Sequence, residues 1–168
     1  MSGWREPLWP DGQMGWSLGR ALWLGCAGAE ALFEIAWARI ILRQAAAGGI
    51  PVLNARSASD GRGPADCTAA DQAAIARIGW IVPRVSARVP WRSDCLVQAI
   101  AAQRLLSRRN LAGRIVLGIE NEAESGFGAH AWLAFGDSIV TGGEVARYTI
   151  LLGEGSHGDG LNEAKQTH

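Results

Sequence analysis

The sequence contains few lysines and few cysteines, and it carries no net charge. Lys165 is the only lysine among 16 basic residues, and 16 acidic residues balance them. A nucleic-acid-binding domain normally carries a strong basic excess, so nucleic acid is not an expected partner. The three cysteines, Cys26, Cys67 and Cys95, are odd in number and widely spaced, which excludes a full disulfide framework and matches no zinc motif.

A long uncharged apolar run is also missing. The most apolar stretch, residues 18–42, is interrupted by four charged residues, Arg20, Glu30, Glu34 and Arg39. A membrane-spanning helix needs about 20 nearly uncharged residues, so we expect no such helix and no membrane partner. The first residues also lack the basic and then apolar order of a secretory signal. We therefore expect a cytoplasmic protein with reduced thiols.

What is present indicates one globular domain. The chain has 168 residues, of which 48% are apolar and 19% charged. This length suits a single domain, which we place at residues 18–152. Residues 1–17, with Trp4, Trp9 and Trp16, are expected to form a loose or docking arm, and residues 153–168 a flexible tail. The wealth of arginine, alanine and glycine is typical of a GC-rich bacterial genome.

Helical signals fill the first two thirds of the chain. Residues 18–46 are predicted to form a long helix whose buried stripe includes Phe33, Trp37 and Ile40, with Glu34 off that stripe. Polar residues 52–68 are interpreted as a linker. Thr68 is a good N-cap for a second helix, which Pro83 should kink or end. A third helix is expected to begin at residue 93 or 94.

The periodicity then changes from helical to alternating. Residues 115–119 are predicted to form a strand, followed by a polar loop at 121–126 and by further strands at 129–135, 138–142 and 147–152. Asn110 fits the left-handed position just past the third helix. Helices followed by short strands predict an α+β fold in which the helices pack on one face of an antiparallel sheet.

Cys95 is the first candidate for chemistry, because it falls in the first turn of the third helix. The helix dipole and the free backbone N–H groups favour a thiolate there, and the same N–H groups could hold the oxyanion of an attacked carbonyl. Cysteine is also among the most buried residue types, so a purely structural role is the alternative.

His130 is the second candidate, on a predicted strand with Trp132 on the same face. It is the only histidine outside the C-terminal tail. An imidazole can take the proton from a thiol and return it to a leaving amine. A cysteine at a helix start followed by a histidine on a strand is the layout of papain-like sites, although a core histidine satisfied by one hydrogen bond is the alternative.

Several segments together resemble the leader peptidases of lasso-peptide biosynthesis. They are residues 90–99 (PWRSDCLVQA), 129–132 (AHAW), 142–143 (GG) and 147–149 (RYT). The resemblance covers about residues 80–152 well, which would be the catalytic core. It implies a transglutaminase-like, papain-related fold and a cysteine peptidase that removes the leader from a ribosomal precursor, so that a partner cyclase can act on the freed amine.

The resemblance also implies roles and partners. Cys95 would be the nucleophile and His130 the base, with no metal or organic cofactor. The partners would be the lasso precursor peptide, the cyclase and a separate leader-recognition protein, because residues 1–17 leave little room for a recognition domain. The chain would then be the stand-alone protease of a split system.

The acid that should orient His130 is not clear from the sequence. The family usually supplies an aspartate after the histidine, and Asp137 is the first acid there. An extended strand would place Asp137 roughly 20 Å from His130. A tight turn would place Gly143 opposite His130, with Glu144 as the adjacent acid pointing to the other face. Asp137 is the nominal third member and Glu144 its rival, and a strand carbonyl could also hold the ring tautomer.

Two other functions remain open at this stage. An acyltransferase of the same superfamily would use the same residues but would pass the thioester to an amine. A non-catalytic partner that binds the peptide or the cyclase would leave Cys95 and His130 buried in the core. Arg84, Arg88 and Arg92 recur every four residues, and a solvated face is a simpler reading of them than a basic groove.

Overall fold

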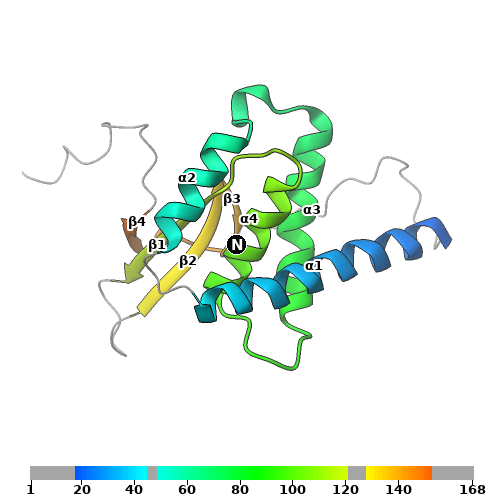
Figure 1. Ribbon diagram of the computed structural model, residues 1–168, viewed down its shortest axis with the longest axis horizontal. Coiled ribbons are helices and arrows are strands. Elements are labelled where there is room, and N and C mark those ends of the chain that lie inside the picture. Colours follow the sequence, from blue (N-terminus) through cyan, green and yellow to red (C-terminus); the bar gives the residue numbers. More distant parts are fainter. Residues whose placement is uncertain (1–17, 45–48, 121–127, 153–168) are drawn as a thin grey trace, which may run out of the picture.

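The molecule consists of a layer of helices packed on one face of a four-stranded sheet. The computed structural model describes residues 18–44, 49–120 and 128–152, so the expected arm (1–17), tail (153–168) and loop (121–126) lie outside the described residues. Its elements are α1 (Leu18–Gln44), α2 (Ile50–Asp60), η2 (Pro64–Asp66), α3 (Ala69–Ser86), α4 (Cys95–Ser107), β1 (Arg114–Glu120), β2 (Gly128–Phe135), β3 (Ser138–Thr141) and β4 (Tyr148–Leu152). Figure 1 shows α4 between α3 and the sheet.

The sheet has the order β3-β2-β1-β4 and all neighbours are antiparallel. The strands meet α4 through a core that includes Ile100, Leu105, Ile115 and Leu133. The chain leaves β3 at one edge and must cross two strands to reach β4 at the other edge. The crossing segment brings Val145 onto the sheet face that the helices do not cover. This arrangement confirms the α+β fold expected from the sequence.

The buried face of α1 differs from the prediction. Ala31, Ile35 and Ala38 are buried in the helix layer, whereas Phe33 and Trp37 are 53% and 42% exposed. Glu34, predicted to lie off the buried stripe, is fully buried because Arg104 and Arg108 of α4 pair with its carboxylate. The predicted stripe was therefore wrong, since ion pairs turn a different face of α1 toward the core.

The segment interpreted as a linker is also ordered. Residues 50–60 form α2, with Pro51 in its first turn, where the missing N–H of proline costs nothing. Asn54 fixes α2 to the first strand, because its side chain donates to the carbonyl oxygen of Ile115 (2.8 Å) and accepts from the Ile115 N–H (2.9 Å). Gln103 of α4 donates to the same Asn54 oxygen at 2.9 Å. The linker prediction was wrong because this tertiary hydrogen bonding outweighs the polar composition.

The start of α3 matches its sequence signal. Thr68 is the N-cap, and it forms a capping box with Asp71. Arg62 and Thr68 donate hydrogen bonds to the Asp71 carboxylate, with Arg62 the larger effect, and they lower its pKa well below the usual range. Pro83 does not end this helix, which continues to Ser86. Asn110 has a φ of 54°, the left-handed conformation expected past α4.

Candidate active site

Cys95 is the first residue of α4. Asp94 precedes it as the N-cap in an extended conformation and makes no side-chain cap hydrogen bond. The first intrahelical bond runs from the Gln98 N–H to the Asp94 carbonyl (3.1 Å). The N–H groups of residues 95–97 precede that bond and have no partner within the helix. A half-buried sulfur thus lies beside backbone donors that are free to bind an anion.

The loop before α4 is fixed by polar contacts. Gln98 donates from its side chain to the Ser93 carbonyl (2.9 Å), and the Ser93 hydroxyl contacts that of Ser86 (3.1 Å). Arg39 of α1 donates to the Arg92 carbonyl. The indole N–H of Trp91 is buried without a partner among the described residues. These contacts hold the helix start in place without occupying the backbone donors at Cys95.

His130 lies in β2, opposite Gly118 of β1. Its ring shares a sheet face with Trp132, the face turned away from α4. The ring Nε2 is 2.7 Å from the carbonyl oxygen of Gly142. A carbonyl only accepts, so in the neutral ring Nε2 carries the proton and Nδ1 has the lone pair. Tyr148 stacks on the ring with a centroid distance of 4.8 Å, and Trp132 lies at 6.0 Å. The orientation and tautomer of His130 are therefore set by a main-chain carbonyl and aromatic packing.

Two glycines make this packing possible. A Cβ on Gly142 would lie 2.3 Å from the Cβ of Trp132, and its φ of 116° is unfavourable for other residues. A Cβ on Gly118 would lie 2.9 Å from both the Trp132 ring and the Tyr148 Cβ. Sequence analysis quoted Gly142 and Tyr148 in motifs but gave them no role. The glycine pair at 142–143, at the end of a predicted strand, was the signal that could have drawn attention to this turn.

Neither candidate acid contacts His130. Asp137 lies in the exposed turn between β2 and β3. Glu144 is exposed as well, and its carboxylate accepts from the Ala146 N–H at 3.1 Å. The register shifts between Leu133 and Ala134, so the simple hairpin register used for the prediction does not hold beyond that point. The hydrogen bond from His130 goes to Gly142 O instead.

The topology places Cys95 and His130 toward the same end of the sheet. Leu106, near the end of α4, packs close to Gly113, and β1 begins directly after Gly113. The first residue of β1 pairs with Ala134 near the end of β2. The beginnings of α4 and β2 therefore both point to the other end. Within the described residues, no hydrogen bond joins the Cys95 sulfur to the His130 ring, since the ring faces away from α4.

The sequence of this chain was compared with known protein families. A model of the transglutaminase-like superfamily matches residues 31–153, which is most of the chain. The chain belongs to the transglutaminase-like superfamily. No curated protein and no solved structure matches it.

Members of this superfamily are generally cysteine-dependent enzymes and include both cysteine peptidases and acyltransferases. The match covers α4 with Cys95 as well as β2 with His130. In this transglutaminase-like chain, the described residues contain no cluster of three His, Cys, Asp or Glu side chains suited to a metal ion. None of the described helices combines the length and apolarity needed to cross a bilayer.

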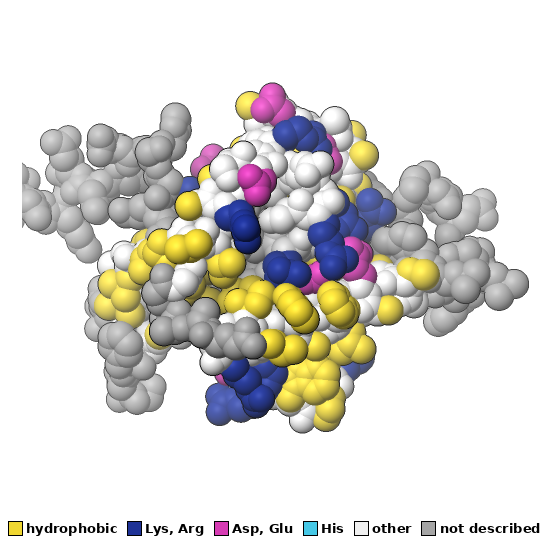
Figure 2. Space-filling model, in the orientation of Figure 1, with side chains coloured by type: hydrophobic (Ala, Val, Ile, Leu, Met, Phe, Trp, Pro, Cys, Tyr) yellow, Lys and Arg dark blue, Asp and Glu magenta, His cyan; other side chains and the backbone are white. Residues whose placement is uncertain are grey.

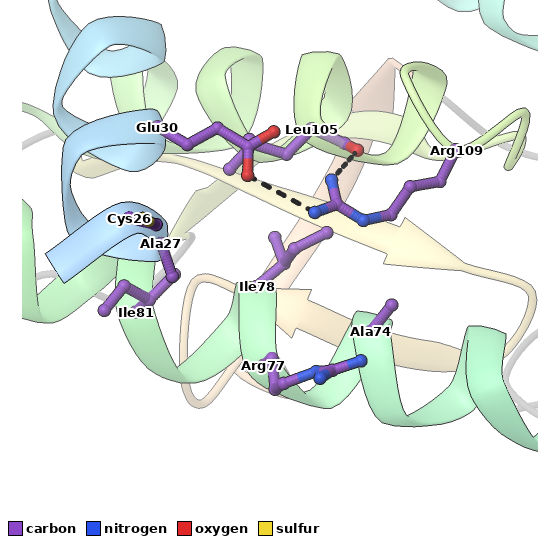
Figure 3. Close-up of a pocket in the computed structure, with 9 residues that line it drawn as sticks. All are labelled: Cys26, Ala27, Glu30, Ala74, Arg77, Ile78, Ile81, Leu105 and Arg109. Carbon is purple, nitrogen blue, oxygen red and sulfur yellow. Dashed lines mark hydrogen bonds and ion pairs between the residues drawn. The ribbon is translucent and has the colours of Figure 1, made fainter. Parts of the chain in front are cut away.

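A cavity in the transglutaminase-like domain lies away from both candidate residues. It has a volume of about 320 Å³ and is lined by residues of α1 and α3, by Leu105 of α4 and by Arg109, which follows α4. Glu30 and Arg109 form an ion pair of 3.3 Å. Figure 3 shows this pair together with Cys26 and Ile78, which also line the cavity. Neither Cys95 nor His130 lines this cavity, so it is not the place where a substrate would meet them.

The arginines before α4 are solvated. Arg84 lies over the ring of Trp80 at 4.1 Å and donates to the Trp80 carbonyl, while Arg88 donates to the Arg84 carbonyl. The side chain of Arg92 is 86% exposed beside Asp94. These contacts favour the simpler interpretation, an exposed charged surface whose arginines bond to nearby main-chain carbonyls and to Asp94.

Proposed function

We propose that this chain is a cysteine peptidase that removes the leader from a ribosomal lasso-peptide precursor, with Cys95 as nucleophile and His130 as general base and acid. The observation that carries the proposal is the state of the His130 ring. Its Nε2–H is held by the Gly142 carbonyl, which leaves Nδ1 unprotonated and able to accept a proton. The motifs around Cys95 and His130 that resemble lasso leader peptidases give the substrate class.

The reaction uses groups that these two elements carry. Nδ1 of His130 takes the proton from the Cys95 thiol, and the sulfur attacks the carbonyl carbon of the bond between leader and core. Free N–H groups at the start of α4 bind the oxyanion. The C–N bond then breaks and the imidazolium gives its proton to the departing amine of the core. Water hydrolyses the thioester on Cys95, releasing the leader as a carboxylic acid.

The chemistry requires the His130 ring to reach the sulfur around the end of the sheet. Both residues lie toward that end, and neither is fully buried. The partners we propose are the precursor peptide, a separate leader-recognition protein and the cyclase that uses the freed amine. Nothing in the reaction calls for a metal or an organic cofactor.

The test is cleavage of a lasso precursor peptide, measured by mass spectrometry with a leader-recognition protein present. Replacing Cys95 with alanine should slow leader removal at least about 1,000-fold, and His130→Ala should have a similar effect. Both variants should melt near the wild-type temperature. Cys67→Ala is the matched control, because Cys67 lies outside both motifs and should be dispensable. Cleavage by Cys95→Ala at the wild-type rate overturns the assignment. A leader mass increased by a transferred amine would indicate acyl transfer instead.

A non-catalytic peptide-binding member is the second candidate. It is favoured by the absence, among the described residues, of a hydrogen bond between Cys95 and His130 and of an acid at the ring. Iodoacetamide separates the two functions without a substrate. An activated Cys95 should alkylate about tenfold faster at neutral pH than Cys67, which is also half-buried, whereas equal rates favour the binding function.

A further inference from the structure

A second pocket lies at the far end of α4 from Cys95. Its volume is about 390 Å³, and its walls come from α2 and α4 and from the residues that follow each helix. Three arginines line it, Arg56 of α2 together with Arg104 and Arg108. We call it the arginine pocket. It shares no residue with the site around Cys95 and His130.

The charges of the arginine pocket are not fully balanced. Glu34 pairs with Nε of Arg104 (2.5 Å) and Nη2 of Arg108 (2.6 Å), which occupies part of each guanidinium group. Asp60 is the other carboxylate, and it accepts from Ser59. The side chain of Arg56 has no partner among the described residues. Glu30 also pairs with Arg108 (3.9 Å) and with Arg109 (3.3 Å). Counting both, four arginines face three carboxylates, which leaves a single positive charge uncompensated.

One buried polar atom also lacks a partner in this pocket. Ser57 is 5% exposed, and its hydroxyl oxygen makes no hydrogen bond with any described residue. A buried hydroxyl without a partner costs free energy, so such groups are normally satisfied. An anionic ligand oxygen in the pocket would accept from both Ser57 and the free guanidinium of Arg56.

An exposed apolar shelf adjoins the arginine pocket. Phe33 and Trp37 of α1 stack with a centroid distance of 6.2 Å, and both are exposed. Arg108 lies 5.8 Å from the Phe33 ring and Arg104 lies 6.0 Å from the Trp37 ring, so the same arginines border pocket and shelf. Figure 2 shows arginines beside a band of apolar side chains near the centre of the view. A ligand that occupies both the arginine pocket and the apolar shelf would combine one negative charge with an apolar group.

We propose that the arginine pocket and its shelf bind an acidic residue flanked by apolar residues in the peptide substrate. The single uncompensated charge matches one carboxylate better than a phosphate dianion, and a guanidinium fork fits the planar carboxylate. Arg104 lies nine residues after Cys95, about 14 Å along the helix axis. An extended peptide spans about 3.3 Å per residue, so the acidic residue would lie at least four residues from the cleaved bond. This inference rests on the proposed function.

The experiment measures binding to the Cys95→Ala protein, so that no cleavage can interfere. The probes are N-acetyl-Leu-Glu-Leu-amide and its Gln counterpart, followed by NMR titration of the full chain. The Glu peptide should bind about tenfold more tightly than the Gln peptide. Arg56→Gln should abolish the preference for the Glu peptide, and Ser57→Ala should reduce the affinity ratio of the two peptides by about threefold. Arg88→Gln, an exposed arginine elsewhere, is the matched control and should leave it unchanged.

Further arms locate the apolar contact and the type of anion. Trp37→Ala should weaken both peptides by a similar factor, because it removes the shelf and leaves the charges. Inorganic phosphate should bind more weakly than the Glu peptide. The proposal is overturned if the two peptides bind with equal affinity or if phosphate binds more tightly than the Glu peptide. It is also overturned if Arg56→Gln melts normally but leaves the preference for the Glu peptide unchanged. These binding measurements use the Cys95→Ala variant, which cannot cleave. Their outcome therefore does not depend on whether the natural protein is a peptidase.

Discussion

Glu34 and His130 are both polar side chains that point into packed layers, and they are held in opposite ways. Glu34 is fully buried under α4, and two guanidinium groups engage both of its carboxylate oxygens. His130 is half-buried on the other face of the sheet, and one main-chain carbonyl engages one of its nitrogens. Both carboxylate oxygens of Glu34 lie against guanidinium groups, Oε1 through an ion pair without a hydrogen bond among the described residues, and full burial closes them to a ligand. The half-buried His130 ring instead leaves Nδ1 available. A fully buried, charge-paired group serves the fold, and a half-buried group with a free nitrogen can serve chemistry.

The largest effect should come from a variant that displaces the main-chain carbonyl to which His130 is hydrogen-bonded. Gly142→Ala would place a Cβ 2.3 Å from the Trp132 Cβ at a positive φ, so the turn carrying the acceptor carbonyl must move. Overpacking and backbone strain together should cost about 3 kcal/mol of unfolding free energy, measured by urea denaturation. Leader removal should fall as well, because His130 loses the bond that fixes its tautomer.

Gly143→Ala separates the two causes. Gly143 also has a positive φ, of 70°, but a Cβ there meets nothing within 4 Å. Its cost should be only the backbone strain, about 1 kcal/mol, with cleavage close to the wild-type rate. If both variants lose the same stability and activity, close packing at Gly142 is not what positions the carbonyl.

Breaking the ion pairs of Glu34 should have a smaller effect on stability. Arg104→Ala removes one of the two cations and leaves the buried carboxylate with Arg108. Breaking a fully buried pair costs 3–5 kcal/mol, and because the Arg104 side chain is 34% exposed we expect about 2 kcal/mol in the same urea experiment. Because Arg104 also lines the arginine pocket, any change in cleavage per folded molecule should come from weaker substrate binding, seen as a raised KM with kcat unchanged.

Two variants show whether the buried charge is the cause. Glu34→Leu combined with Arg104→Leu removes both partners of one pair and should recover at least half of the loss, since no unpaired carboxylate remains buried. Arg92→Ala removes an arginine whose side chain is 86% exposed and should cost less than about 0.5 kcal/mol. A loss of the same size in all three variants would contradict a specific role for the Glu34 pairs.

The same comparison explains how far the sequence could predict the fold. Periodicity located α1, α3 and α4 and the four strands, because spacing along the chain is a local property. It could not predict which face of α1 is buried. Glu34 turns inward only because Arg104, 70 residues later, meets it. The linker interpretation of residues 52–68 failed for a similar reason, since Asn54 is bonded to Ile115, 61 residues away.

The candidate site was predictable to the level of side chains but not of main-chain atoms. Cys95 at a helix start and His130 on a strand follow from local pattern, and the structure places both on the expected elements. The partner of His130 is a carbonyl, which every residue carries and no motif marks. Its position also depends on the register shift at Leu133 and Ala134, which the alternating pattern does not reveal.

The smallest effect is expected at Asp137, and it sharpens the comparison most directly. If the Gly142 carbonyl alone orients His130, Asp137→Asn should change leader cleavage by less than about twofold, because a backbone carbonyl can fix the ring tautomer without an acid. Asp137 is exposed at the turn between β2 and β3, so the stability of the variant protein should also be unaffected. Glu144→Gln is the matched control, since that carboxylate already accepts from Ala146. A loss of 100-fold or more in Asp137→Asn alone would mean that the turn rearranges to bring an acid to His130.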